Sequence, residues 1–144
     1  MMEISEIREF TQDGFKAVQK LAGTLISSGT IHLTESYYRE LLASANSHLF
    51  FIADDGNIAG MLTVGIYKSP TGTKAWIEDV VVDGSYRGQG LGRLLVEHAI
   101  AFSKSLGADS LMLTSNPSRI AANKLYQSLN FTQKETNVYR MTFE

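Results

Sequence analysis

The chain has 144 residues, with 13 lysines and arginines against 15 aspartates and glutamates, and it contains no cysteine. This length is typical of one domain, which we expect to span residues 1–144. The net charge of −2 provides no bulk attraction to nucleic acid or to an anionic membrane, so neither is expected as a partner. The lack of cysteine excludes disulfides, thiolate metal sites and a cysteine nucleophile.

The apolar runs of the sequence are short, whereas a membrane-spanning helix needs about 20 successive apolar residues. The N-terminal segment is acidic and lacks the long apolar stretch of a secretory signal, so we expect a cytoplasmic protein. The three histidines, His32, His48 and His98, form neither an H-x-H nor an H-E-x-x-H pair. We therefore expect no metal site.

The N-terminal part of the chain predicts a strand followed by two helices. Residues 4–8 alternate weakly between apolar and polar side chains, which indicates a strand. Thr11 can cap a helix that extends to about residue 26, because apolar residues recur there at helical spacing, and residues 27–29 should end it. Thr34 should begin a second, shorter helix.

Three strands are expected next, over residues 49–53, 58–67 and 75–83. The dipeptide Asp55-Gly56 between the first two is a favourable hairpin turn, because both residues tolerate a positive φ. Gly60 and Gly65 weaken the second of these strands and mark positions where bulges can form.

The second half of the chain predicts alternating helices and strands. Gly107 and Asn130 suit the left-handed residue that closes a helix. The resulting order, β-α-α-β-β-β-α-β-α-β-β, predicts an α/β (α+β) fold with a mixed sheet and helices on its faces. The later elements are expected as a helix over residues 91–106, a buried strand over 110–114, a helix from Pro117 or Ser118, and extended chain from Phe131 with a last strand over 138–143.

The most informative stretch is a strand that runs through a glycine-rich turn into an amphipathic helix. The first amides of a helix lack internal partners and its dipole favours negative charge, so this arrangement suits an anion. Gly88, Gly90 and Gly92 let the backbone approach a phosphate without a Cβ clash. Arg87 and Arg93 flank the turn and can add charge-assisted contacts.

Two other phosphate motifs are excluded by the residue order. A Walker loop ends in Gly-Lys-Ser/Thr, and this turn ends in Leu91-Gly92-Arg93. A dinucleotide fingerprint needs G-x-G-x-x-G, and its third glycine is replaced by Arg93 or Leu95, depending on the register. A plain flexible turn that caps a helix is the alternative interpretation.

The run Arg87-Gly88-Gln89-Gly90-Leu91-Gly92 matches the R/Q-x-x-G-x-G/A motif and resembles the GCN5-related N-acetyltransferase (GNAT) family. The resemblance continues in the loop at Asn116, in the helix over residues 119–126 and in the exit Leu129-Asn130-Phe131. It implies the GNAT acyl-CoA N-acyltransferase fold and acetyl transfer from acetyl-CoA directly to a primary amine of a small molecule or a peptide, in a ternary complex. An acyl-CoA-binding regulatory module of the same fold, without significant turnover, is the alternative.

The resemblance also implies which residues hold acetyl-CoA. The strand that carries the three valines should splay from the strand over residues 110–114, and the pantetheine arm should lie in the gap between them. The pyrophosphate should lie on the amides of the glycine turn. The implied cofactor-binding residues are Val80, Val81, Val82, Arg87, Gly88, Gln89, Gly90, Leu91, Gly92, Arg93, Asn116, Asn123 and Tyr126.

Direct transfer needs one group that takes a proton from the amine and one that gives a proton to the departing thiolate. Tyr126 matches the tyrosine that acts as the general acid in the family; the alternative is a core tyrosine. Glu78 and Asp79 are the candidate bases, directly or through a water, and a regular strand turns only one of them towards the cleft. Glu78 then shares its side with Val80 and Val82, unless a bulge changes the parity.

The acceptor is left open by the sequence: an amino sugar phosphate, an amino acid, a small amine and a peptide N-terminus all fit. Lys74 and Arg140 are the obvious cations near the expected pocket. A monomer and a homodimer are both compatible with the alternating apolar residues of the last strand. The expected substrate-binding residues are His32, Trp76, Glu78, Asp79 and Tyr139.

Overall fold

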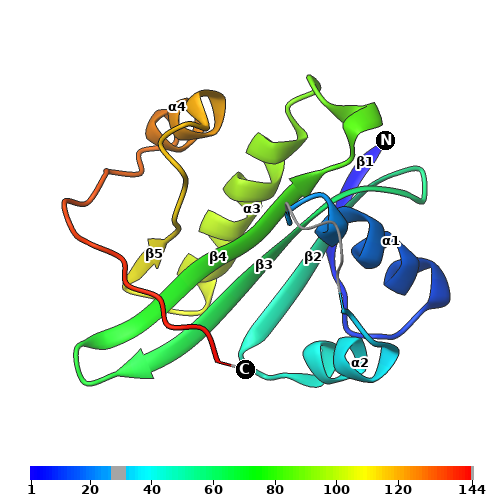
Figure 1. Cartoon of the computed structure of the whole chain (residues 1–144), viewed down its shortest axis with the longest axis horizontal. Coiled ribbons are helices and arrows are strands. Elements are labelled where there is room, and N and C mark those ends of the chain that lie inside the picture. Colours follow the sequence, from blue (N-terminus) through cyan, green and yellow to red (C-terminus); the bar gives the residue numbers. More distant parts are fainter. Residues whose placement is uncertain (27–31, 144) are drawn as a thin grey trace. The chain divides into compact units, whose positions relative to one another are not determined.

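The computed structural model describes residues 1–26 and 32–143. The first helix, expected to reach about residue 26, ends at Gly23, and residues 27–29, which are expected to end it, lie outside the described part. The chain forms two compact units, Met1–Leu113 and Thr114–Glu144. The first unit contains the whole sheet and three of the α-helices, and the second contains one helix (Figure 1). No helix in the described ranges is long and apolar enough to cross a membrane.

The first unit is built on a five-stranded mixed sheet, which confirms the expected fold class. The strands follow one another in the order β1-β2-β3-β4-β5; β4 and β5 are parallel and all other neighbours are antiparallel. The strands are β1 (Met2–Glu6), β2 (Ser47–Asp54), β3 (Asn57–Ser69), β4 (Gly72–Val82) and β5 (Ser110–Met112).

Local signals fix most element ends in this unit. Helix α1 (Gln12–Gly23) begins where the Thr11 hydroxyl accepts from the Gly14 amide at 3.0 Å. Helix α2 (Glu35–Ala43) begins in the same way at Thr34. The β2–β3 hairpin turns through Asp55 and Gly56, with φ of 47° and 90°, as a tight hairpin requires.

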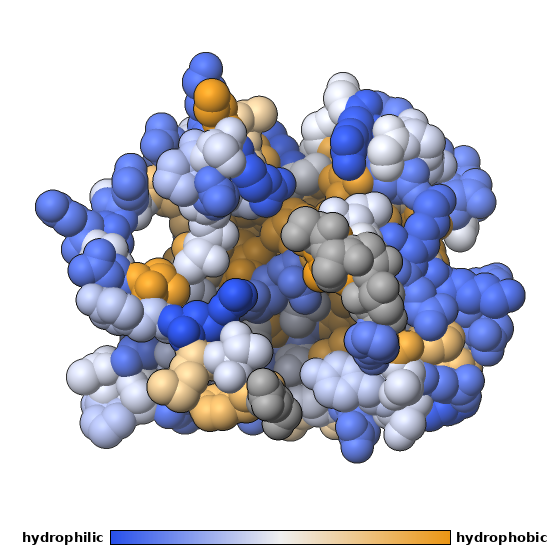
Figure 2. Space-filling view, viewed as in Figure 1, coloured by the Kyte–Doolittle hydropathy of each residue, from blue (hydrophilic) through white to orange (hydrophobic). Residues whose placement is uncertain are grey.

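The two faces of the sheet are covered by different helices (Figure 1). Helices α1 and α2 pack on the face that presents Phe51, Met61 and Val81. Helix α3 (Leu91–Ser105) packs on the opposite face, where the Phe102 ring lies 4.9 Å from that of Phe50. Each of these helices therefore buries one apolar side. Hydrophilic side chains cover the outer surface of α1, on the right in Figure 2.

The second unit contains helix α4 (Ile120–Ser128). The helix begins later than expected, because the Asn116 side chain accepts from the Ser118 amide and holds residues 116–119 in a turn. It ends as expected, with Asn130 left-handed at a φ of 72°.

The expected strands after Phe131 are wrong, since the structure has no strand over residues 131–143. The alternation of Tyr139, Met141 and Phe143 specifies which side a strand would bury, but a strand also needs a paired neighbour. All three side chains are exposed, the least of them at 78%.

Candidate functional site

A bulge in β4 lies at the position where the catalytic carboxylates are expected. Thr63 pairs with Glu78 and Met61 pairs with Val81, so Asp79 and Val80 stand opposite Leu62 alone. Asp79 adopts a φ of 53°, the left-handed conformation that a bulge can require. The bulge therefore places Glu78 on the face of Val81, and the expectation that it shares the side of Val80 and Val82 is wrong.

The edge of β4 beyond residue 76 is open towards β5. The parallel ladder joins Lys74 to Ser110, Ala75 to Leu111 and Trp76 to Met112, and no pairing with β5 continues over residues 77–82. This is the expected splay of the two strands. An extended group with amides of its own can pair with such an edge as an added strand does.

Beyond β4 the chain makes a short 3₁₀ turn, η1 (Gly84–Tyr86), before the glycine-rich segment. The Asp83 carboxylate accepts from the Ser85 amide at 3.0 Å and from its hydroxyl at 2.8 Å. Gly88 and Gly90 have φ of 81° and 76°, so both need glycine, and a Cβ at either would meet nothing within 4 Å. The space beside both glycines is therefore unfilled by the described residues.

Helix α3 starts directly after this turn at Gly90, and no side chain caps it. The amides of its first turn have no partner within the helix, so they are available to an anion together with the positive end of the dipole. Leu91 is buried and can contribute only through its backbone. The guanidinium of Arg93 lies 3.6 Å from Glu97 of the same helix, and the Arg87 side chain is exposed.

Asp83 also joins this turn to α1, a link that the sequence analysis missed. Its carboxylate lies 2.9 Å from the ammonium of Lys20. The Ser85 backbone amide, followed by the hydrogen bond to Lys20, lowers the pKa of Asp83 to about 2. An aspartate two residues before a serine is a recognisable turn signal in the sequence. The ion pair of Asp83 with Lys20, about sixty positions earlier, leaves no such local pattern.

The carboxylates at the bulge are both exposed. Desolvation, and after it the charge of the adjacent Asp79, raises the pKa of Glu78 above its ordinary value. A raised pKa makes a carboxylate a better proton acceptor near neutral pH, as a general base must be. Trp76 is half-buried and shares the Glu78 face, whereas His32 is exposed before α2. Tyr139 belongs to the second unit.

The second unit brings Asn116 and Asn123 together. The side-chain amide of Asn123 donates to the backbone carbonyl of Asn116 at 3.0 Å and to the backbone carbonyl of Arg119 at 2.8 Å. It therefore holds the loop before α4 in place. The Tyr126 ring packs edge-on against Phe131 at 6.0 Å. Desolvation raises the pKa of the Tyr126 phenol, although the charge of Arg119 acts in the opposite direction.

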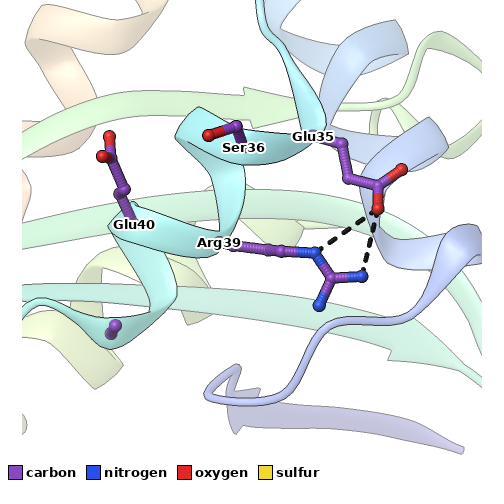
Figure 3. Close-up of a pocket in the computed structure, with 5 residues that line it drawn as sticks. Glu35, Ser36, Arg39 and Glu40 are labelled. Atoms are coloured by element: carbon purple, nitrogen blue, oxygen red, sulfur yellow. Dashed lines mark hydrogen bonds and ion pairs between the residues drawn. The ribbon is translucent and has the colours of Figure 1, made fainter.

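A separate surface depression of about 500 Å³ lies along α2 (Figure 3). Two of its three charged side chains pair with each other, because Arg39 contacts Glu35 at 3.0 Å; Arg39 also stacks 3.8 Å from the centre of the Phe10 ring. None of the sequence-predicted site residues lines it. In the described ranges, no group of histidine, aspartate and glutamate side chains could hold a metal ion.

The comparisons with known proteins point to one family. The family model described as "Acetyltransferase (GNAT) family" matches residues 15–131. A glucosamine 6-phosphate N-acetyltransferase of Arabidopsis thaliana is 30% identical over 122 residues, which cover 78% of this chain and 82% of that protein. A ribosomal protein bS18-alanine N-acetyltransferase of Escherichia coli strain K12 is 40% identical over 60 residues, covering 42% of this chain and 40% of that protein.

Among solved structures, an aminoglycoside acetyltransferase from an uncultured soil metagenomic sample, in complex with sisomicin, superposes with a TM-score of 0.86. It is 19% identical, and the match covers 99% of this chain and 96% of that chain, so the likeness concerns the fold. The chain spans 59%, 32% and 46% of the lengths of three bacterial relatives that it matches.

Proposed function

The chain belongs to the GNAT acetyltransferase family, and from this premise we propose that it moves an acetyl group from acetyl-CoA directly to a primary amine of a small molecule or a peptide. The observation that carries the proposal is the continuity of two sites along one strand. The open edge of β4 over residues 77–82 leads into the glycine turn and the uncapped start of α3.

Both sites fit the chemical parts of acetyl-CoA. The pantetheine arm contains amides that can pair with the free edge of β4. The pyrophosphate is a dianion that suits the first amides of α3, and in the turn before them a Cβ at Gly88 or Gly90 would meet nothing within 4 Å. When bound, acetyl-CoA supplies an activated thioester; the residues of the chain position it and move the protons.

Two side chains are assigned to proton transfer. Glu78 takes a proton from the ammonium form of the acceptor, and the free amine attacks the carbonyl carbon of the thioester. The new C–N bond replaces the C–S bond while Tyr126 donates its phenolic proton to the departing sulfur. The new amide nitrogen then loses its second proton, which restores the Tyr126 phenol through solvent. The raised pKa of Glu78 and the position of the carboxylate beside the β4 bulge support the first role. The motif match supports the second.

Calorimetry with acetyl-CoA, ATP and NAD, followed by a panel of primary amines, tests this proposal. We expect saturable binding of acetyl-CoA alone and transfer to at least one amine. A Tyr126→Phe variant should keep its affinity for acetyl-CoA and lose at least tenfold in kcat. Binding without turnover on any amine would support the regulatory module, and preferential binding of ATP or NAD would contradict both.

A further inference from the structure

The β3–β4 hairpin beyond the bulge has one closed face and one open face. On the α3 side, Val64, Ala75 and Ile77 are at most 4% exposed. On the other side, the opposed pairs are Thr63 with Glu78, Gly65 with Trp76, and Tyr67 with Lys74, and all six residues are half-buried or exposed. We call these six residues the open strip. The core under α1 and α2 includes Met61 and Val81, so the open strip begins where that core ends.

The open strip carries two aromatic side chains and one unfilled position. Trp76 lies across from Gly65, and a Cβ at Gly65 would meet nothing within 4 Å. The position across the ladder from Trp76 is therefore unfilled. The Tyr67 ring side chain, 50% exposed, follows next along the same face. Aromatic side chains beside free space offer apolar contact area to a ligand.

The far end of the open strip carries a cation without a carboxylate partner. The Lys74 ammonium donates to the hydroxyls of Ser69 at 2.6 Å and Thr71 at 2.5 Å. Within residues 1–26 and 32–143, no carboxylate lies within ion-pair distance of it. Lys20, by contrast, is paired with Asp83. An ammonium whose described partners are neutral oxygens attracts an anionic ligand group.

The base and the cation stand at opposite ends of the open strip. Lys74 and Glu78 are separated by four steps along one strand, or about 13 Å at the strand rise. An acceptor whose amine lies at Glu78 and whose body crosses Trp76 would therefore extend its far end towards Lys74. We propose that the acceptor is an elongated primary amine with a carboxylate or phosphate group at the end remote from the amine, selected by Lys74. This inference rests on the proposed function, because it deepens the specificity of the same site.

Matched acceptors of graded length test the proposal. We would compare ω-amino carboxylates and ω-amino alkyl phosphates with ω-amino alcohols of the same chain length. Acetyl transfer is the first readout. The second is the fluorescence of Trp76, the single tryptophan of the chain, which reports binding at the open strip without any turnover. We expect the anionic acceptors to exceed the alcohols roughly tenfold in apparent affinity and in kcat/KM.

The control variant lies in the same hairpin. Lys68 contacts the hydroxyl of Thr73 at 2.8 Å and belongs to the opposite face of the ladder. Lys74→Met should remove the advantage of the anionic acceptors, Lys74→Arg should retain part of it, and Lys68→Met should leave it intact. A stronger effect with phosphates than with carboxylates would identify the preferred anion.

The outcomes separate this inference from the proposed function. Equal responses to anions and alcohols, or equal losses in Lys74→Met and Lys68→Met, would overturn the inference even if acetyl transfer occurs. If no amine is acetylated, the proposed function fails. A Lys74-dependent fluorescence change with the anionic amines would then still support recognition at the open strip, and its absence would overturn that as well.

Discussion

The two ligand sites that we propose at the ends of β4 use different kinds of groups. At the end that follows the bulge, the recognising groups belong to the backbone: the free strand edge, the turn at Gly88 and Gly90, and the first amides of α3. At the hairpin end they are the side chains of Lys74 and Trp76. The difference explains why one ligand can be inferred from a motif and the other cannot. A backbone site requires glycine at positive φ, whereas lysine and tryptophan are compatible with many environments.

Glu78, next to the bulge between the two ends, is where we expect the largest effect. Glu78→Gln should lower kcat at least a hundredfold if the carboxylate is the base, with little change in affinity for acetyl-CoA. The base must be ionised to act, so wild-type kcat/KM should rise with pH as Glu78 loses its proton. Because the Glu78 pKa is raised, this rising limb of the pH–rate profile should lie at a higher pH than the ordinary pKa of a glutamate. This limb should disappear in the variant.

The matched control for Glu78 is its neighbour. Asp79→Asn keeps the bulge residue polar and able to adopt positive φ, and it removes the charge that contributes to the raised Glu78 pKa. The acid limb should therefore move to lower pH in this variant while turnover persists. A Glu78→Gln enzyme with a wild-type rate across the pH profile would remove Glu78 as the base.

A medium effect, on acetyl-CoA binding alone, is expected from a substitution at Gly90, in the turn that follows β4. Alanine at a φ of 76° costs roughly 1–2 kcal/mol of conformational strain in the turn that we propose as the phosphate site. Gly90→Ala should weaken acetyl-CoA binding about tenfold in calorimetry. Gly56→Ala imposes a similar strain at a φ of 90° in the β2–β3 hairpin, again with nothing within 4 Å, and should leave binding unchanged. Equal losses in both variants would mean that the effect is only a general loss of stability.

The sequence predicted those parts of the molecule that are set by local chemistry. The caps at Thr11 and Thr34, the hairpin at Asp55-Gly56 and the left-handed Asn130 each depend on neighbouring residues, and all were found. The bulge expected near Gly60 is also present, as a register shift opposite Ile52. Gly65, the other predicted bulge position, pairs regularly with Trp76.

The features that escaped prediction depend on partners distant in the chain. The parity of Glu78 changed because β3 and β4 differ by one residue between two pairs of the ladder, and no local pattern encodes that count. The alternation after Val138 indicated a strand, but a strand needs a neighbouring edge as well as a pattern. The Lys20–Asp83 pair joins two elements that the sequence separates widely.

That pair provides the smallest expected effect, again at the acetyl-CoA end. Asp83→Asn keeps an oxygen that can accept from Ser85 and removes the charge that contacts Lys20. We expect a two- to fivefold loss of acetyl-CoA affinity, because η1 should hold the turn less firmly, and no change in the preference for anionic acceptors. Calorimetry with acetyl-CoA measures the first effect, and calorimetry with the anionic and neutral acceptors measures the second. A loss of acceptor preference without a loss of acetyl-CoA affinity would break the division between the two ends of β4.

The acid stability of the same variant tests the electrostatics of the turn. The Asp83 pKa is depressed to about 2 in the folded state from an ordinary 3.8, so its contribution to stability is present above about pH 4 and lost as the pH falls towards 2. The difference in Tm between the wild type and Asp83→Asn should therefore shrink over that window. Lys20→Met should keep most of the pH dependence, because the Ser85 amide is the larger cause of the shift. If Lys20→Met abolished it instead, the ion pair and not the cap would hold the turn.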